Sequence, residues 1–205
     1  LLGAGCFELV DSGLTVFGRE VVDEMNRVGM VIDLSHAGHK TSMEVISYSK
    51  RPVAVTHANP NAWHATPRNL HHDLLQALAE TGGMVGFSLY PHHLKSGSEC
   101  SLEEFSDMAS NMIQTYGSKT FGIGSDLCQG QPDSVVNWMR NGHWRKKPGP
   151  TVKFPKPPTW FKDNSDFLGL AKGLRRSTIS DADVDRLVGK NWMSFLEKAL
   201  VPDER

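Results

Sequence analysis

The fold is constrained most strongly by a regular alternation of short apolar segments and amphipathic segments along the first 124 residues. The apolar segments are rich in β-branched residues and are short enough to be buried strands, whereas the segments between them repeat their apolar positions with helical spacing. Repeated strand–helix–strand units require a parallel sheet with right-handed crossovers, so the predicted fold class is α/β. The predicted strands are 30–35, 52–56, 84–89 and 120–124, and the predicted helices are 17–27, 41–49, 70–81 and 101–116.

Several helix ends carry local signals. Gly29 is placed to terminate the helix over 17–27 in a left-handed conformation. The patterns Thr41-x-x-Glu44 and Ser101-x-x-Glu104 have the form of capping boxes that begin the next helices. Ser180-x-x-Asp183 similarly predicts a final helix that runs to Leu200.

The alternation breaks between residues 128 and 165, a stretch rich in proline and glycine that also holds Trp138, Trp144 and Trp160. It is too long for an ordinary connection, so we interpret it as an irregular excursion that forms a lid or an interface. We expect C-terminal helices over 166–200 and one domain over residues 1–205.

Charge and composition exclude several classes of protein. The chain has 22 Lys and Arg against 23 Asp and Glu, and its one basic run is Arg145-Lys146-Lys147, which argues against a nucleic-acid groove. It has no run of 18 apolar residues, so we expect neither a membrane span nor a membrane partner. Cys6, Cys100 and Cys128 are scattered and odd in number, which favours a reducing compartment and a cytoplasmic location.

Three of the four predicted strands lead into a residue that can bind a metal or transfer a proton. The first is followed by His36, the second by His57 and the fourth by Asp126. Ligands of parallel α/β proteins bind at the carboxyl ends of the strands, so these side chains should meet. Neutral imidazoles suit Zn²⁺, and a carboxylate nearby can take a proton from metal-bound water. The pattern therefore predicts metal-assisted hydrolysis.

The same motifs resemble the membrane (renal-type) dipeptidase family, zinc metallohydrolases related to the amidohydrolase superfamily. The resemblance runs from about Gly13 to Leu200, except for the excursion. It rests on five motifs in the family's order: Ile32-Asp33-Leu34-Ser35-His36, Val53-Ala54-Val55-Thr56-His57, Gly83-Met84-Val85-Gly86-Phe87-Ser88-Leu89-Tyr90-Pro91, Phe121-Gly122-Ile123-Gly124-Ser125-Asp126 and Gly189-Lys190-Asn191-Trp192, with Arg68 eleven residues after His57.

This resemblance implies a (β/α)8 TIM-type barrel that cleaves the peptide bond of dipeptides with two zinc ions, of which this chain covers roughly the second half. His36 and His57 would be ligands of one zinc. Arg68 would bind the carboxylate of the substrate, Tyr90 would line the pocket, and Asp126 would orient or deprotonate the attacking water and protonate the departing amine.

The chain also departs from the family. We find no counterpart of the family's upstream His-x-Asp metal ligands or of its bridging glutamate, and four strand units are half of a closed barrel. Open sheet edges would then need a cover, so we expect a missing N-terminal half-barrel or a second copy of the chain as partner. The family's Asp-Phe-Asp sequence is Asp126-Leu127-Cys128 here, which leaves the substrate preference open.

Alternatives follow from these departures. One is a non-catalytic fragment or pseudo-enzyme that binds one weak metal or none. Another is an amidohydrolase that acts on N-acyl amino acids or lactams. We expect His39 to be solvated or to precede a helix, and the remaining histidines to lie in loops or on the surface rather than to bind metal, namely His64, His71-His72 and His92-His93. Since His92-His93 follow the end of the third predicted strand, a position at the rim of the substrate site is the alternative for this pair.

Overall fold

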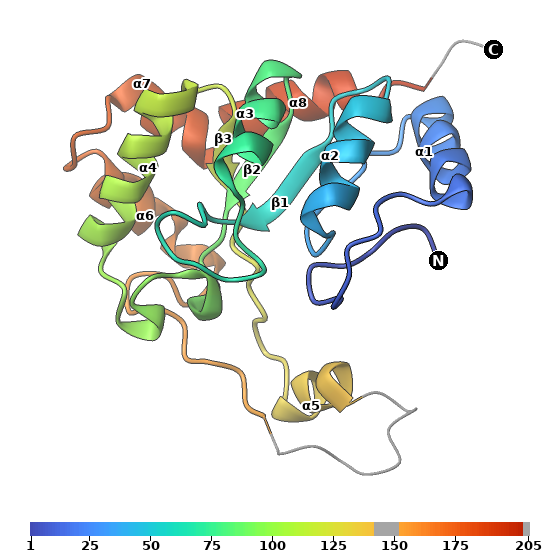
Figure 1. The fold of residues 1–205 in the computed structure, drawn as a ribbon. Coiled ribbons are helices and arrows are strands. Elements are labelled where there is room, and N and C mark those ends of the chain that lie inside the picture. The colour runs from blue at the N-terminus through green and yellow to red at the C-terminus, as the bar shows by residue number, and fades with distance from the viewer. Residues whose placement is uncertain (142–151, 203–205) are drawn as a thin grey trace.

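The computed structural model describes residues 1–141 and 152–202. Its centre is a parallel sheet in the order β1-β2-β3, with α-helices packed around it (Figure 1). Val85 of β2 pairs with Val55 of β1 and with Phe121 of β3, so the three strands are in close register. The predicted α/β fold with a parallel sheet is therefore confirmed. The strands are β1 (Ala54–Ala58), β2 (Met84–Phe87) and β3 (Phe121–Ile123).

The predicted strand over 30–35 is reduced to one parallel bridge. Asp33 pairs with Ala54, and the amide of Leu34 donates to the Ala54 carbonyl at 2.7 Å. The ladder stops there because the next amide of β1, that of Thr56, donates to the Asp33 carboxylate at 3.0 Å. A side chain thus takes the position that a backbone carbonyl would hold in a continuous strand.

The helices agree with the predicted alternation, with the exceptions given below. Gly29 ends α1 at a φ of 70°, and the Ser101 and Ser180 side chains accept the amides of Glu104 and Asp183. The helices are α1 (Val16–Val28), α2 (His39–Tyr48), α3 (His72–Glu80), α4 (Leu102–Tyr116), α5 (Asp133–Asn141), α6 (Phe167–Leu174), α7 (Asp181–Asp185) and α8 (Asn191–Ala199). A π-helical turn at Arg186–Lys190 divides the predicted final helix into α7 and α8.

The capping box predicted at Thr41 is wrong, because α2 begins two residues earlier, at His39. The first turn of α2 is capped instead by a side chain that is distant in sequence. The Asp11 carboxylate accepts the Lys40 amide at 2.6 Å and the Thr41 hydroxyl at 2.9 Å. Glu44 accepts the amide of Leu14 at 2.7 Å instead of turning back to the helix start.

The segment 128–165 is not wholly irregular, since it contains helix α5. In Figure 1 this helix projects away from the sheet and the other helices. The return segment after residue 152 is held against the domain by Trp160, whose indole donates to the Cys100 carbonyl at 2.7 Å and packs against Phe105. Trp138 is 55% exposed, and Trp144 lies outside the described residues.

Side chains of the sheet alternate between two hydrophobic clusters, as the pleat of a strand requires. Val55, Val85 and Phe87 belong to the larger cluster, which includes residues of α3 and α4. Ala54 and Met84 belong to a smaller cluster with Phe195 of α8. Both faces of the sheet are therefore covered within the described part of the chain.

Helix α8 also covers the outer edge of β3. The Asn191 amide group donates to the Phe121 carbonyl at 2.7 Å, and the Trp192 indole donates to the Ile123 carbonyl at 2.9 Å. The indole lies where a side chain at Gly122 would be. Side chains of α8 thus tie this helix to the outer carbonyls of β3, which is the structural role of the Asn191-Trp192 motif.

The carbonyl of Thr56 makes close contact with two glycines, Gly86 of β2 and Gly124 directly after β3. A Cβ atom at Gly86 would lie 1.9 Å from this oxygen, and one at Gly124 would lie 1.7 Å from it. The approach is possible only without side chains at these positions. It allows β1 to change register between Val55 and Ala58, at the position of His57.

Replacing Gly86 by Ala should therefore cost about 2 kcal/mol or more, because the backbone of β1 must move to relieve the clash. The matched control is Gly169→Ala on helix α6, where a Cβ atom would have no neighbour within 4 Å. That change should be neutral or stabilise by up to about 1 kcal/mol. Urea unfolding of the full-length protein measures both, and equal stabilities would contradict the close approach.

Because the Asp11 carboxylate caps α2, we expect the free energy of unfolding to depend on pH. Burial raises the pKa of Asp11, but hydrogen bonds from Thr41, Gly13 and Lys40 outweigh it and hold the pKa below the ordinary value. A lowered native pKa stabilises the fold above the ordinary pKa of about 4, and the stabilisation is lost as the pH falls through the native value.

Asp11→Asn should therefore destabilise the protein by about 1 kcal/mol near neutral pH. The difference from the wild type should shrink on acidification below pH ~4. Thermal unfolding of both proteins over a pH series measures this effect, and a difference that stays constant down to acid pH would contradict it.

Candidate active site

The residues expected to carry the chemistry meet at the carboxyl ends of the strands. His36 and Asp126 have φ values of 70° and 52° and are the non-glycine residues with positive φ in the described ranges 1–141 and 152–202. Such backbone conformations cost energy and are typical of functional sites. His57 lies in β1 at the register shift. Each of the three side chains is therefore directed by an irregularity of the backbone.

The two imidazoles converge. Nε2 of His57 lies 3.3 Å from Nε2 of His36 and 4.0 Å from an oxygen of the Asp126 carboxylate. The two histidines are 21 residues apart in sequence; His36 lies in the turn that follows the bridge at Asp33, and His57 lies in β1. The convergence that the sequence predicted is present in the structure.

The proton of His57 is placed by a chain of hydrogen bonds. The Thr56 hydroxyl donates to the Asp33 carboxylate at 2.7 Å, which uses its single proton. The 2.9 Å contact between this hydroxyl and Nδ1 of His57 must then be donated by the ring. Neutral His57 therefore carries its proton on Nδ1, and the lone pair of Nε2 faces His36.

Asp33 anchors this chain and was not identified as a site residue from the sequence. Its carboxylate also accepts the amides of Thr56 and Ser35 at 3.0 and 2.9 Å. Although burial raises the pKa of Asp33, these hydrogen bonds lower it below the ordinary value, so the group stays ionised. Its position in the sequence could have identified it, because Asp33 and Thr56 lie in the two segments that lead into His36 and His57.

The pKa of Asp126 is shifted in the direction opposite to that of Asp33. Burial raises the pKa of its carboxyl group above the ordinary value, while His57 and Arg68 oppose the shift. A raised pKa close to an imidazole pair favours a group that exchanges a proton during a reaction. The neighbouring Cys128 thiol lies 3.8 Å from the Asp126 carbonyl oxygen.

Arg68 contacts the backbone of His57 and is 7% exposed. One guanidinium nitrogen donates to the His57 carbonyl at 3.1 Å, whereas its buried Nε atom has no hydrogen-bond partner in the described part of the chain. The Cys6 thiol is a close neighbour, and burial raises the pKa of that thiol although Arg68 opposes the shift. An unused donor on a buried cation suits an anionic group of a ligand.

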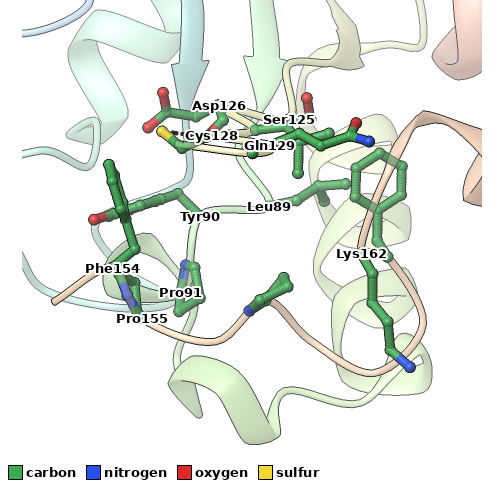
Figure 2. A pocket seen from close by; sticks show the side chains of 14 residues that line it. Leu89, Tyr90, Pro91, Ser125, Asp126, Cys128, Gln129, Phe154, Pro155 and Lys162 are labelled. Carbon is green, nitrogen blue, oxygen red and sulfur yellow. Dashed lines mark hydrogen bonds between the residues drawn. The ribbon is translucent and has the colours of Figure 1, made fainter. Parts of the chain in front are cut away.

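Tyr90 and His93 follow β2. Tyr90 is half-buried and lines a cavity together with Asp126 (Figure 2). His93 lies in the turn after β2, but a surface position is wrong for it, because it is 4% exposed and shares a 2.7 Å hydrogen bond with Ser88. Burial, with Arg68 and His57 nearby, lowers the pKa of His93 to about 3. The turn Pro91–His93 folds this ring inward, which sequence spacing does not reveal.

The imidazole pair fits one divalent cation. Tetrahedral zinc with bonds of about 2.05 Å to two imidazoles places their nitrogens about 3.3 Å apart, and the observed separation is 3.3 Å. The described residues contain no group of three or more His, Cys, Asp or Glu side chains arranged to hold a metal. The residues that the structure describes thus offer the two imidazoles as ligands, and a complete coordination shell would need further ligands.

Comparison with known proteins agrees with this geometry. A model of the membrane dipeptidase family, peptidase family M19, matches residues 4–140. The chain belongs to this family. The resemblance drawn from the strand-end motifs is therefore confirmed.

Relatives with curated names are dipeptidases. An uncharacterized dipeptidase of Schizosaccharomyces pombe is 34% identical over 193 residues, which are 93% of this chain and 41% of that protein. The Aspergillus oryzae dipeptidase aclJ is 36% identical over 117 residues, 56% of this chain and 28% of that protein. The chain thus spans less than half the length of these relatives.

Solved structures share the fold. An amidohydrolase from Pseudomonas aeruginosa is 33% identical with a TM-score of 0.89, over 98% of this chain and 61% of the other. A metallopeptidase from Rhodobacter sphaeroides, solved with a phosphinate mimic of L-Ala-D-Ala, is 26% identical with a TM-score of 0.75, over 93% of this chain and 48% of the other. In the described ranges, no helix has the length and apolarity needed to cross a membrane.

The hydrogen bond from His57 to Thr56 can be tested through metal affinity. In the full-length protein, Thr56→Val should weaken binding of Zn²⁺ or Co²⁺ by about 10- to 100-fold, because His57 loses the partner that fixes its tautomer and ring orientation. Competition with a chromogenic chelator measures the affinity. Thr81→Val makes the same chemical change at the exposed end of α3 and should leave it unaltered; equal affinities in all three proteins would contradict the role of Thr56.

Proposed function

We propose that the full-length protein is a zinc-dependent dipeptidase and that this chain supplies one metal-binding half of its active site. The observation that carries the proposal is the 3.3 Å separation of the His36 and His57 Nε2 atoms, with Asp126 4.0 Å from His57. The membership in the M19 family and the dipeptidase names of the relatives support it.

His36 and His57 would hold one zinc ion, and a second zinc would be held largely by residues from the rest of the protein. When bound, zinc polarises the scissile carbonyl and lowers the pKa of a coordinated water to near neutrality. Asp33 and Thr56 keep the proton of His57 on Nδ1, so that Nε2 stays available as a ligand.

Asp126 would act as the acid–base group. Its raised pKa lets it accept a proton from the attacking water and return it to the departing amine. Arg68 would bind the carboxylate of the dipeptide, using the buried Nε donor that has no partner in the described residues. Tyr90 would line the substrate site beside Asp126.

We further propose that the sheet is part of a (β/α)8 barrel. The parallel order β1-β2-β3 and the bridge at Asp33 account for four successive positions, and the likeness to an amidohydrolase structure over 61% of its length supports a larger domain. The remaining strands would come from the part of the protein outside this chain, which would also bring the further metal ligands.

A reducing, cytoplasmic location is also proposed. Cys6, Cys100 and Cys128 are free thiols in the structure, and Cys100 is buried. Structural disulfides are typical of oxidising compartments, so their absence from the described residues agrees with this proposal.

The proposed function is tested with the full-length protein loaded with zinc. It should hydrolyse free dipeptides faster than their C-terminal amides, because Arg68 binds a carboxylate. Asp126→Asn should lower kcat by about 10²- to 10⁴-fold without loss of bound zinc. Kinetics and elemental analysis measure the two quantities.

The same experiment separates the alternatives. Zinc binding with no turnover of any amide would indicate a pseudo-enzyme. Turnover of N-acyl amino acids or lactams in preference to dipeptides would identify a different amidohydrolase. Full activity in Asp126→Asn would contradict the proposed acid–base role of Asp126.

A further inference from the structure

A cavity of about 210 Å³ opens directly beside Asp126. One wall consists of the segments that follow β2 and β3, including Leu89, Tyr90 and Leu127. The other wall is the return segment 154–162, which contributes Phe154 (Figure 2) and the buried ring of Phe161. The return segment lies beyond the residues that match the family model. This wall is thus a feature of this chain that the family match does not cover.

The return segment is held in place at several points. Backbone groups of Val152 exchange two 2.7 Å hydrogen bonds with the Asn137 side chain. The Ser98 hydroxyl donates to the Lys156 carbonyl at 2.6 Å, and Trp160 donates to the Cys100 carbonyl at 2.7 Å. The wall is therefore formed by ordered contacts to α5 and to the segment before α4.

The side chains that line the cavity are mostly apolar, and Ser125, Asp126, Gln129 and Lys162 are its polar members. Its walls are mainly aliphatic and aromatic side chains and prolines. Lys162 also belongs to the lining, but Figure 2 shows its amine directed away from Asp126. At about 210 Å³ the space is smaller than the ~300 Å³ or more of a pocket for a whole small-molecule ligand, and it suits one side chain.

We propose that this cavity is the subsite for an apolar side chain on the amino-terminal residue of the substrate, a specificity that rests on the proposed dipeptidase function. Arg68, the group assigned to the substrate carboxylate, lines a separate cavity with Cys6 and Thr66 and is absent from the lining of this one. The carboxyl-terminal residue is held there. The amino-terminal residue therefore extends past Asp126 into the apolar cavity.

The first test compares kcat/KM of the full-length enzyme for Leu-Ala, Phe-Ala, Glu-Ala and Gly-Ala. The wild type should prefer Leu-Ala over Gly-Ala by at least tenfold and should discriminate against Glu-Ala. Phe154→Ala should reduce the Leu-Ala preference at least fivefold, and Gln129→Trp should reduce it by filling the mouth of the cavity. Leu168→Ala removes an apolar side chain that is 75% exposed on α6, and it should leave the preference unchanged.

Equal kcat/KM for Leu-Ala and Gly-Ala, or a preference unaltered in both cavity variants, would overturn the subsite while leaving dipeptide hydrolysis in place. The wild type could instead prefer Ala-Leu over Ala-Gly and lose this preference in Phe154→Ala. That result would assign the cavity to the carboxyl-terminal residue and would also overturn the proposal.

The second test does not depend on turnover. Cys128 lines the cavity and is exposed, whereas Cys6 is partly buried and Cys100 is buried. In full-length Asp126→Asn protein, Leu-Ala should slow alkylation of Cys128 at least threefold more than Gly-Ala, as measured by mass spectrometry. The difference should vanish in the Phe154→Ala background. Equal protection by both dipeptides overturns the subsite. Selective protection, together with a wild-type protein that cleaves no dipeptide, supports the subsite and refutes the enzyme.

Discussion

The hydrogen-bond chain from Asp33 through Thr56 to His57 is the interaction on which the rest of the site depends. The Asp33 carboxylate ends the strand ladder by taking the Thr56 amide, and it takes the Thr56 hydroxyl proton as well. The first bond ends the pairing between β1 and the segment of Asp33, and the second directs the proton of His57 to Nδ1. One carboxylate thus sets both the position and the protonation of the metal-facing imidazole.

Two glycines allow β1 to change its register against β2. Thr56 turns its carbonyl toward Gly86 and Gly124, where no side chain could be accommodated. The same strands are packed on both faces by buried apolar residues, and α8 holds the outer carbonyls of β3. A closely packed frame of this kind can hold His36 and Asp126 in backbone conformations that cost energy, because the surrounding contacts prevent relaxation.

The predictable part of the site followed from periodicity. Because parallel strands end at one edge of a sheet, the order of strands and helices alone predicted that His36, His57 and Asp126 would meet. Asp33 was not predicted as a site residue because it reads as one more polar residue at a strand end. His93 was expected in a loop or on the surface, and its burial was missed because the inward turn after β2 depends on a contact with Ser88 that local sequence does not encode.

The sequence by itself determined the alternation of strands and helices, the family and the strand-end position of the reactive groups, since these follow from local apolar periodicity and motif spacing. Only the tertiary structure decided the remaining features: the remote cap of α2 by Asp11, the tautomer of His57, and the apolar cavity between Asp126 and the return segment. Each of these requires groups distant in sequence to meet at hydrogen-bond or van der Waals distance, and such meetings are set by the packing of the whole chain.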